Sequence, residues 1–343
     1  TYLNQQWNAI MERSRSVSMQ DIAAEAGVSA QTVSRVANGG KAVKPETRQR
    51  VEEAMAKLGY RPNAAARALK HGRFQNIGVV LFDMTSYGDS RILNAIAEAA
   101  QSQEYAVTVQ RIVKGNGHTL QSAVERMRQL PVDGVIVVLQ EYIDDFNTYE
   151  PDKELPVVII AEEPAAHCPT IDADNYGCAK TAVEYLLEHG HRTVYHIAGP
   201  VVSRAARIRQ LGWQDALRKA GIAIPPLYRG DWNADSGYQA GLALANEPDC
   251  TAVYAANDQM AYGAILGLQA AGKRVPEDVS VMGVDDSLIG MVPRLGLTTM
   301  RMPFTEIVRQ AFDMIIRQCE GGLVPANTRR TVATTLIERA SVR

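Results

Sequence analysis

From residue 77 onward, short apolar runs rich in Val and Ile alternate with stretches of helical periodicity. The runs are almost continuously hydrophobic, so both faces of each strand are predicted to be covered. Such strands, alternating with amphipathic helices, predict parallel sheets with helices on both sides, and they fit two doubly wound units better than one. The predicted strands are 77–82, 105–113, 134–139, 155–160, 193–198, 251–256 and 279–284, and the predicted helices lie near 90–103, 118–130, 175–189, 204–220, 235–246, 258–271 and 304–319.

The composition excludes several classes of protein. A chain of 343 residues is too long for a single small domain. It contains no apolar run of about 18 residues, so no membrane span is expected. Residues 1–16 lack an apolar core and are interpreted as a disordered tail rather than a signal peptide. The four cysteines are widely spaced and predict buried free thiols in a cytoplasmic protein, not a metal site or a disulfide framework: Cys168, Cys178, Cys250 and Cys319.

Catalytic motifs are missing from the chain. No glycine-rich dinucleotide or phosphate loop follows any predicted strand, and no nucleophile-elbow motif occurs. The six histidines show no metal-ligand spacing. An enzyme on a Rossmann-like fold is therefore disfavoured, and we predict no catalytic residue, no cofactor and no metal.

Residues 17–61 predict a small helical domain before this α/β body. Ser18 and Asp21 have the spacing of a capping box, and Gly27 supplies a left-handed stop. Ser29 is placed to cap a second helix that ends at Asn38-Gly39-Gly40. Pro45 opens a third helix, with Val51, Ala54, Met55 and Leu58 as its buried stripe and Gly59 as its end. Two short helices joined by a glycine-containing turn predict a helix-turn-helix unit.

In a helix-turn-helix unit, the N-terminal residues of the second helix meet base edges in the major groove. Gln31 can bond an adenine edge, Arg35 a guanine edge, and Ala30 can touch a thymine methyl group. The remaining polar residues are suited to phosphate oxygens: Ser29, Thr32, Ser34 and Asn38.

The positive net charge of this segment is consistent with a nucleic-acid partner. Residues 17–74 hold ten Lys or Arg and five Asp or Glu, a net charge of +5 in a chain whose total is −2. A basic head on a nearly neutral body suits DNA binding. The alternative is an ordinary three-helix bundle with a solvated basic face.

The sequence DIAAEAGVSAQTVSRVANG, followed by VKPETRQRVEEAMAKLGYRPNAAARAL, closely resembles the head of the lactose-repressor/galactose-repressor (LacI/GalR) family. Lys44 is a departure, because a small capping residue is common there. The resemblance implies a DNA-binding repressor with a hinge at residues 62–76. In that hinge a short helix would fold on DNA and enter the minor groove, with Leu69 as the wedge and Arg67 and Lys70 near phosphates or the groove floor. A plain linker with one helical turn is the alternative.

The body resembles the sugar-binding core of the same family, itself similar to periplasmic binding proteins. GHRTVYHIAGP, RIRQLGW, ANDQMAYGA, VSVMGVDDS and LTTMRMP carry this resemblance in family order. It implies two subdomains between which the chain crosses near residues 173, 303 and 333. The expected boundaries are 77–173 with 304–332 for the first subdomain and 174–303 with 333–343 for the second.

Polar side chains at the ends of predicted strands mark a ligand site, because ligands of open α/β sheets bind at the carboxyl ends of strands. Arg209 would clamp hydroxyls or a carboxylate, with a surface helix arginine as the alternative. Asn257 and Asp285 would bond hydroxyls, and Trp232 would either stack on a sugar ring or pack in the hinge or core. Asp258 is an alternative cap for the following helix, and Asp286 is a cap or an interface residue. Tyr87 is a candidate for the opposite wall, Glu162 and Glu163 are weaker candidates, and Met302 replaces a polar residue common in the family.

These features together predict a repressor of sugar-utilisation genes that binds a palindromic operator as a homodimer. A small sugar or disaccharide would release it, since the GDW segment resembles the disaccharide-responsive branch of the family. One alternative is a corepressor-dependent regulator that responds to a non-sugar metabolite. Another, a sugar-binding protein for uptake, is disfavoured by the head and by the lack of an export signal.

Overall fold

The computed structural model describes residues 17–37, 42–60, 72–82, 84, 86–112, 119–152, 154–163, 165, 167–292 and 296–343. The chain divides into two compact units, residues 1–74 and residues 75–343. In the described part of the chain, no helix combines the length and the apolar character needed to cross a membrane. The predicted hinge positions Arg67, Leu69 and Lys70, the residue Asn38, and the predicted tail 1–16 all lie outside the described residues.

The described residues of the first unit form the helices α2 (Met19–Ala26), α3 (Ala30–Ala37) and α4 (Pro45–Leu58). Ser18 and Asp21 form the predicted capping box, and Gly27 ends α2 with a φ of 63°. Ser29 accepts a hydrogen bond from the Thr32 amide at 3.2 Å, as predicted for the cap of α3. Lys44 precedes α4 without a side-chain capping bond. The core of this unit consists of small and branched apolar residues: Ile22, Ala23, Ala26, Val33, Val36, Val51 and Ala54.

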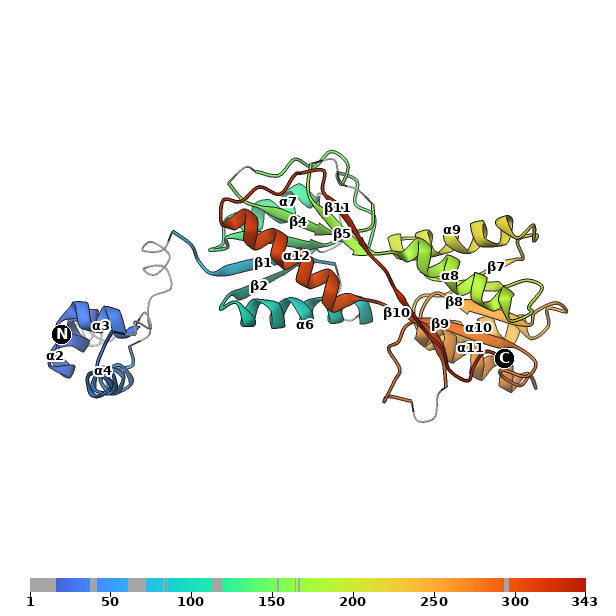
Figure 1. The fold of residues 1–343 in the computed structure, drawn as a ribbon, viewed down its shortest axis with the longest axis horizontal. Helices are drawn as coiled ribbons and strands as arrows, with labels where there is room; N and C mark the ends of the chain where they lie inside the picture. The colour runs from blue at the N-terminus through green and yellow to red at the C-terminus, as the bar shows by residue number, and fades with distance from the viewer. Residues whose placement is uncertain are drawn as a thin grey trace, which may run out of the picture. The chain divides into compact units, whose positions relative to one another are not determined.

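The second unit is built on two six-stranded sheets (Figure 1). The first sheet has the order β11-β5-β4-β3-β1-β2, and all its neighbouring strands are parallel. Helices α6 (Tyr87–Ser102) and α12 (Phe304–Cys319) cover one face, and α7 (Leu120–Arg128) covers the other. We call this sheet with its helices the first lobe. Its strands are β1 (Asn76–Leu81), β2 (Ala106–Arg111), β3 (Gly134–Val138), β4 (Val157–Ile160), β5 (Thr170–Ala173) and β11 (Arg329–Val332).

The second sheet has the order β12-β10-β9-β8-β6-β7. Helices α8 (Asn175–Glu188) and α9 (Arg204–Lys219) cover one face, and α10 (Ala234–Leu244) and α11 (Asp258–Ala270) cover the other. We call this assembly the second lobe. Its strands are β6 (Tyr195–Ala198), β7 (Leu227–Arg229), β8 (Ala252–Ala255), β9 (Ser280–Asp285), β10 (Thr298–Arg301) and β12 (Thr335–Ile337).

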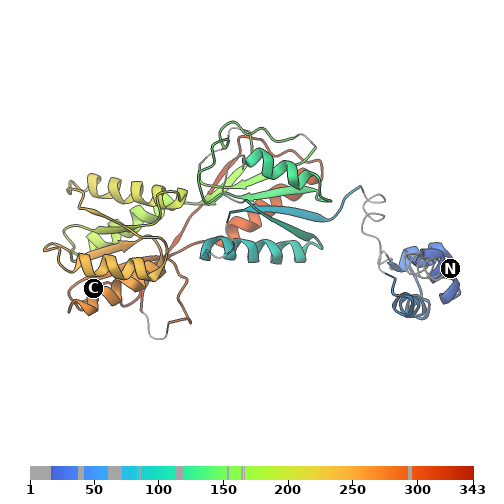
Figure 2. The same ribbon diagram turned by 180° about the vertical axis from the view of Figure 1, so that it is seen from behind.

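The chain passes between the lobes three times: from β5 to α8, from β10 to α12, and from β11 to β12 (Figure 2). The third passage leaves the first sheet at the carboxyl end of β11 and enters the second sheet from the side where its parallel strands end. For this reason β12 pairs with β10 antiparallel, and the second of the two predicted doubly wound sheets carries one antiparallel edge strand.

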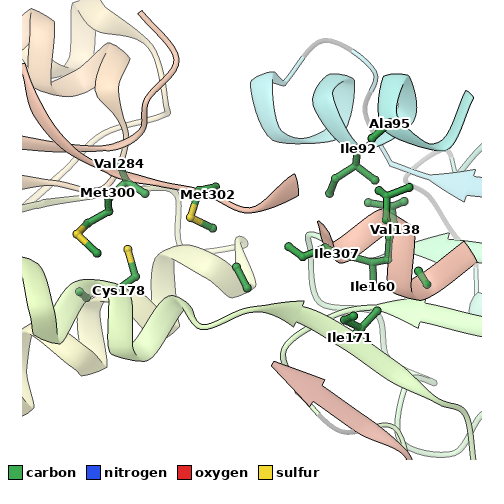
Figure 3. Packing of buried hydrophobic residues seen from close by; sticks show 14 of the residues in the cluster. Ile92, Ala95, Val138, Ile160, Ile171, Cys178, Val284, Met300, Met302 and Ile307 are labelled. Atoms are coloured by element: carbon green, nitrogen blue, oxygen red, sulfur yellow. The ribbon is translucent and has the colours of Figure 1, made fainter. Parts of the chain in front are cut away.

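Apolar side chains continue from one lobe toward the other along these passages. Figure 3 shows Ile92, Val138 and Ile160 inside the first lobe and Val284 and Met300 inside the second. Met302 lies between them on the passage from β10 to α12, with 7% of its surface exposed. The passages from β5 to α8 and from β10 to α12 are therefore packed through buried side chains.

Candidate functional site

A cavity of about 470 Å³ lies between the two lobes, where the parallel strands of both sheets end. Its volume falls in the usual range for small-molecule sites. The first lobe contributes the end of β1, the start of α6 and the segment after β3, and the second lobe contributes the remainder. The lining residues are Phe82, Ser86, Tyr87, Gly88, Asp89, Ser90, Gln140, Glu141, Pro200, Val202, Ser203, Ala205, Arg209, Trp232, Asn233, Asn257, Gln259 and Asp285.

Arg209 projects from α9 and is only 5% exposed, so the idea that it is a surface arginine is wrong. Its Nε donates to Asn175 Oδ1 at 2.9 Å, and its Nη1 donates to the carbonyl of Ala256. The Nη2 atom lies 4.0 Å from Asp285 Oδ1, and the guanidinium carbon lies 6.0 Å from the ring centre of Trp232. The hydrogen bonds of Nε and Nη1 thus fix the side chain, and Nη2 faces the Asp285 carboxyl group in the cavity wall.

Asp285 ends β9 with 10% of its side chain exposed and a φ of 110°. This left-handed backbone is unusual for a residue with a side chain and marks a locally strained position. Burial raises the pKa of the carboxyl group to about 7, although the Arg209 guanidinium acts in the opposite direction. The geometry therefore holds a hydrogen-bonding carboxyl group against a fixed cation at the cavity surface.

Asn257, and not Asp258, caps the helix α11, and Asn257 also lines the cavity. Asn257 caps α11, because its Oδ1 accepts from the Met260 amide at 2.9 Å, and its Nδ2 donates to the carbonyl of Trp232 at 2.9 Å. The prediction that Asp258 is the cap is wrong. Its buried carboxylate accepts from the Thr299 hydroxyl and the Ser287 amide, both at 2.6 Å.

Aromatic residues enter the cavity wall from both lobes. Trp232 precedes α10 with a φ of 76°, and its ring lies against Gly199, where an added Cβ would come within 2.3 Å of it. Tyr87 opens α6 and meets Phe304 edge to face, with 6.1 Å between ring centres. The fold thus brings two predicted aromatic residues, separated widely in the chain, to one cavity.

Glu162, predicted as a weaker ligand contact, is not among the residues that line this cavity. Its Oε1 accepts from the Tyr176 amide at 3.4 Å, and burial raises its pKa. Asp286 is not a helix cap: it pairs with Arg301 and Arg339, each at 2.7 Å. Sequence reasoning missed Asp89, Gln140 and other polar residues of the lining, although the polar segment around Tyr87 was a usable signal.

The predicted DNA-reading helix α3 has one buried and one accessible side. Val33 and Val36 are buried against the other helices. Ala30, Gln31 and Arg35 are exposed, and Thr32 and Ser34 are half-buried. Ser29 is exposed but its hydroxyl already serves as the cap of α3. The residues predicted to read bases are thus accessible on one short helix.

A helix-turn-helix unit followed by a two-lobed binding-protein fold defines a class of ligand-responsive DNA-binding regulators. Residues 18–63 match the family model of bacterial regulatory proteins of the lacI family, and residues 183–342 match the periplasmic binding protein-like domain. The lactose operon repressor of Escherichia coli K12 is 31% identical over 95% of this chain and 90% of its own length.

Two solved structures extend the likeness to three dimensions. The lac repressor dimer bound to operator and the anti-inducer ONPF matches with a TM-score of 0.79 and 30% identity, over 95% of this chain and 99% of that one. The complex of the transcriptional regulator CelR with cellobiose matches with a TM-score of 0.69 and 28% identity, again over 95% and 99%.

The chain belongs to the lacI family of bacterial regulatory proteins. It is a DNA-binding transcriptional repressor and not an enzyme, and its two-lobed body is an effector-binding domain for a small molecule.

Proposed function

We propose that this repressor controls sugar-utilisation genes and leaves its operator when a neutral sugar, most simply a disaccharide, binds in the inter-lobe cavity. One observation carries the proposal. The cavity combines the fixed Arg209–Asp285 pair with an aromatic residue from each lobe, Trp232 and Tyr87.

Each part of this wall suits one feature of a sugar. Asp285 can accept hydrogen bonds from vicinal hydroxyls, and the remaining amide hydrogen of Asn257 can donate to a ring or hydroxyl oxygen. The Trp232 ring can cover the apolar face of a pyranose. Similarity to the lactose operon repressor and to the complex of CelR with cellobiose supports a disaccharide as the effector.

The DNA-binding part of the proposal rests on α3 and on the expected hinge. Gln31, Arg35 and Ala30 would contact bases, and Ser29, Thr32, Ser34 and Asn38 would contact phosphates. One head covers half of an operator, so a homodimer would read a near-palindrome. Hinge residues Arg67, Leu69 and Lys70 would meet the minor groove. Closure of the lobes on the sugar would separate the paired hinges, and the repressor would act in the cytoplasm.

We assign residues 77–173 and 304–332 to one ligand-binding subdomain and residues 174–303 and 333–343 to the other. The strand membership of the two sheets supports these boundaries. Residues 17–61 form the DNA-binding domain, and 62–76 form the hinge and linker.

Calorimetry with a panel of mono- and disaccharides, followed by gel shifts with the sugars that bind, tests the proposal. Asp285→Ala should still bind operator but lose the response to sugar. Asp278→Ala is a matched control, because that acid lies in the same lobe and pairs with Arg274 at the surface. Normal sugar binding by Asp285→Ala would contradict the site. Tighter operator binding with ligand would favour the corepressor alternative.

A further inference from the structure

One arginine of the second lobe is held almost entirely by the first lobe. Arg204 opens α9 and is 4% exposed. Its guanidinium carbon lies 4.6 Å from the ring centre of Tyr142 and 4.2 Å from that of Phe146. Both rings belong to the segment that follows β3 in the first lobe. The Arg204 guanidinium group of the second lobe is therefore enclosed by two aromatic rings of the first lobe.

Polar contacts act at the same place. Arg204 Nε donates to the carbonyl of Glu141 at 3.1 Å, and Nη1 donates to the Glu163 carboxylate. The Arg204 amide donates to the carbonyl of Gln140 at 3.0 Å, and Glu141 forms an isolated antiparallel bridge with Ser203. Backbone and side chain of one residue thus bind the two lobes together.

A neighbouring arginine reinforces this contact. Arg207, one turn along α9, donates from Nη1 to the Tyr142 hydroxyl at 3.1 Å. The same hydroxyl lies 3.4 Å from Glu163 Oε1. Tyr142 is therefore held between two cations of the second lobe and an acid of its own lobe.

The contact adjoins the effector cavity. Four residues that flank Arg204 or bind it line the cavity, whereas Arg204 itself is not among the lining residues: Gln140, Glu141, Ser203 and Ala205. Stacking on two aromatic rings stabilises a buried guanidinium, and removing one partner of its ion pair is strongly destabilising because the remaining charge stays desolvated and unpaired. Separation of the lobes at this end would break every one of these contacts together.

We propose that Arg204 is an inter-lobe clasp that closes one end of the cavity and positions Gln140, Glu141 and Ser203 in its wall. Its effect on the effector rests on the function proposed above. Effector affinity scales with the fraction of molecules whose cavity is already formed. Arg204 is thus a positioning residue that raises affinity without touching the effector.

Hydrogen exchange of the Arg204 amide tests the clasp in the full chain without any ligand, because its acceptor lies in the other lobe. Glu163→Gln and Phe146→Leu should each speed exchange at Arg204 by roughly tenfold, since local opening sets the rate. Arg218→Ala is the control: it lies on the same helix, but its partner Asp215 is at the surface of the same lobe. Unchanged exchange in both variants would overturn the clasp.

Calorimetry with lactose and cellobiose tests the positioning role. Phe146→Leu should bind the better of these sugars about tenfold more weakly, and Arg204→Lys, which keeps the charge but not the planar stack, should fall between it and the wild type. Fast exchange with unchanged affinity would overturn positioning. Failure of the wild-type chain to bind either sugar would contradict both the proposed effector and the positioning role of Arg204. The exchange rates would still test whether Arg204 holds the two lobes together.

Discussion

Asp285 and Asp258 are acids whose charged forms are disfavoured by their surroundings. Burial raises the pKa of Asp285 to about 7 against the effect of Arg209. Burial also raises the pKa of Asp258 to about 6, against hydrogen bonds from Thr299 and Ser287. An aspartate in an unfolded chain titrates near about 3.9. Between about pH 4 and pH 7 these acids, together with Asp172, whose pKa burial also raises to about 7, bind more protons in the folded state. Their contribution to the free energy of unfolding therefore falls as the pH rises.

We expect the body to be more stable near pH 5 than near pH 8, as measured by urea unfolding. The opposite dependence comes from the buried His191 and His196, whose pKa values burial lowers to about 4 and about 3. It also comes from acids such as Glu306, whose pKa the Arg309 hydrogen bonds lower to about 2. Asp285→Asn removes the charge and keeps the shape, so it should reduce the difference between the two pH values. If the stability difference between pH 5 and pH 8 were the same in Asp285→Asn and the wild type, Asp285 would not titrate between these pH values.

Arg35 is exposed near the end of α3, where a guanidinium can reach a guanine edge. Arg35→Ala should weaken binding to the preferred operator by about 1–3 kcal/mol and change random DNA much less. Gel shifts on both DNAs at one salt concentration measure this. Arg48→Ala, which removes a half-buried arginine of α4 near Glu52, serves as the comparison. Equal weakening on both DNAs would count against base reading by Arg35.

Among the elements, α10 and α11 pack with their backbones in unusually close approach. An added Cβ at Gly237 would lie 2.1 Å from the carbonyl of Met260, and one at Gly267 would lie 2.3 Å from that of Tyr238. Neither obstacle is a flexible side chain, so neither can move aside. The spacing of these glycines, rather than large side chains, sets the distance between the two helices.

Gly263→Ala should destabilise the second lobe by about 1–3 kcal/mol or more, because its methyl group would meet the Ala234 carbonyl at 1.9 Å. Gly88→Ala provides a matched helical control. Its Cβ would meet only the Phe304 ring at 3.9 Å, an ordinary contact. Chemical unfolding of both variants gives the comparison. Equal stability would mean that the helices move apart at little cost.

The sequence predicts the apolar strands well and the polar ones poorly. Each run of Val and Ile contains a strand, but β5, β7, β10 and β11 were not predicted. In β5 and β10, buried threonines stand where aliphatic residues would signal a core, and β7 and β11 are short, partly exposed edge strands. Thr298 and Thr299 are fully buried, and their hydroxyls donate to the Arg339 carbonyl and to Asp258. Partners that lie far away in sequence make such polar strands possible, and a local pattern does not reveal them.

The same reasoning applies to the candidate site. Arg209, Trp232, Asn257 and Asp285 were predicted because each follows a strand or lies in a family motif, and all of them line the cavity. Glu162 also follows a strand, yet its carboxylate turns toward the start of α8. The role of Arg204 depends on residues of the opposite lobe, so no periodicity within α9 could have indicated it.

At the scale of the whole molecule, effector binding and operator binding must change each other's affinity by the same factor. If sugar binding weakens operator binding by some factor, operator must weaken sugar binding by the same factor, typically about 5–150-fold in allosteric proteins. Calorimetric titration of sugar into free and operator-bound repressor, compared with gel shifts with and without sugar, measures both sides. Sugar affinity unaffected by operator, together with sugar-dependent release, would be thermodynamically inconsistent and would point to a second sugar site.

The order in which the two sheets receive their strands has a consequence for synthesis. The first sheet obtains its edge strand β11 and its covering helix α12 only after strands β6 to β10 of the second sheet have been translated. The second sheet receives β12 later still. A nascent chain whose DNA-binding head has already emerged therefore carries two unfinished sheets, and the ability to respond to an effector arises in both lobes nearly at once, at the close of translation.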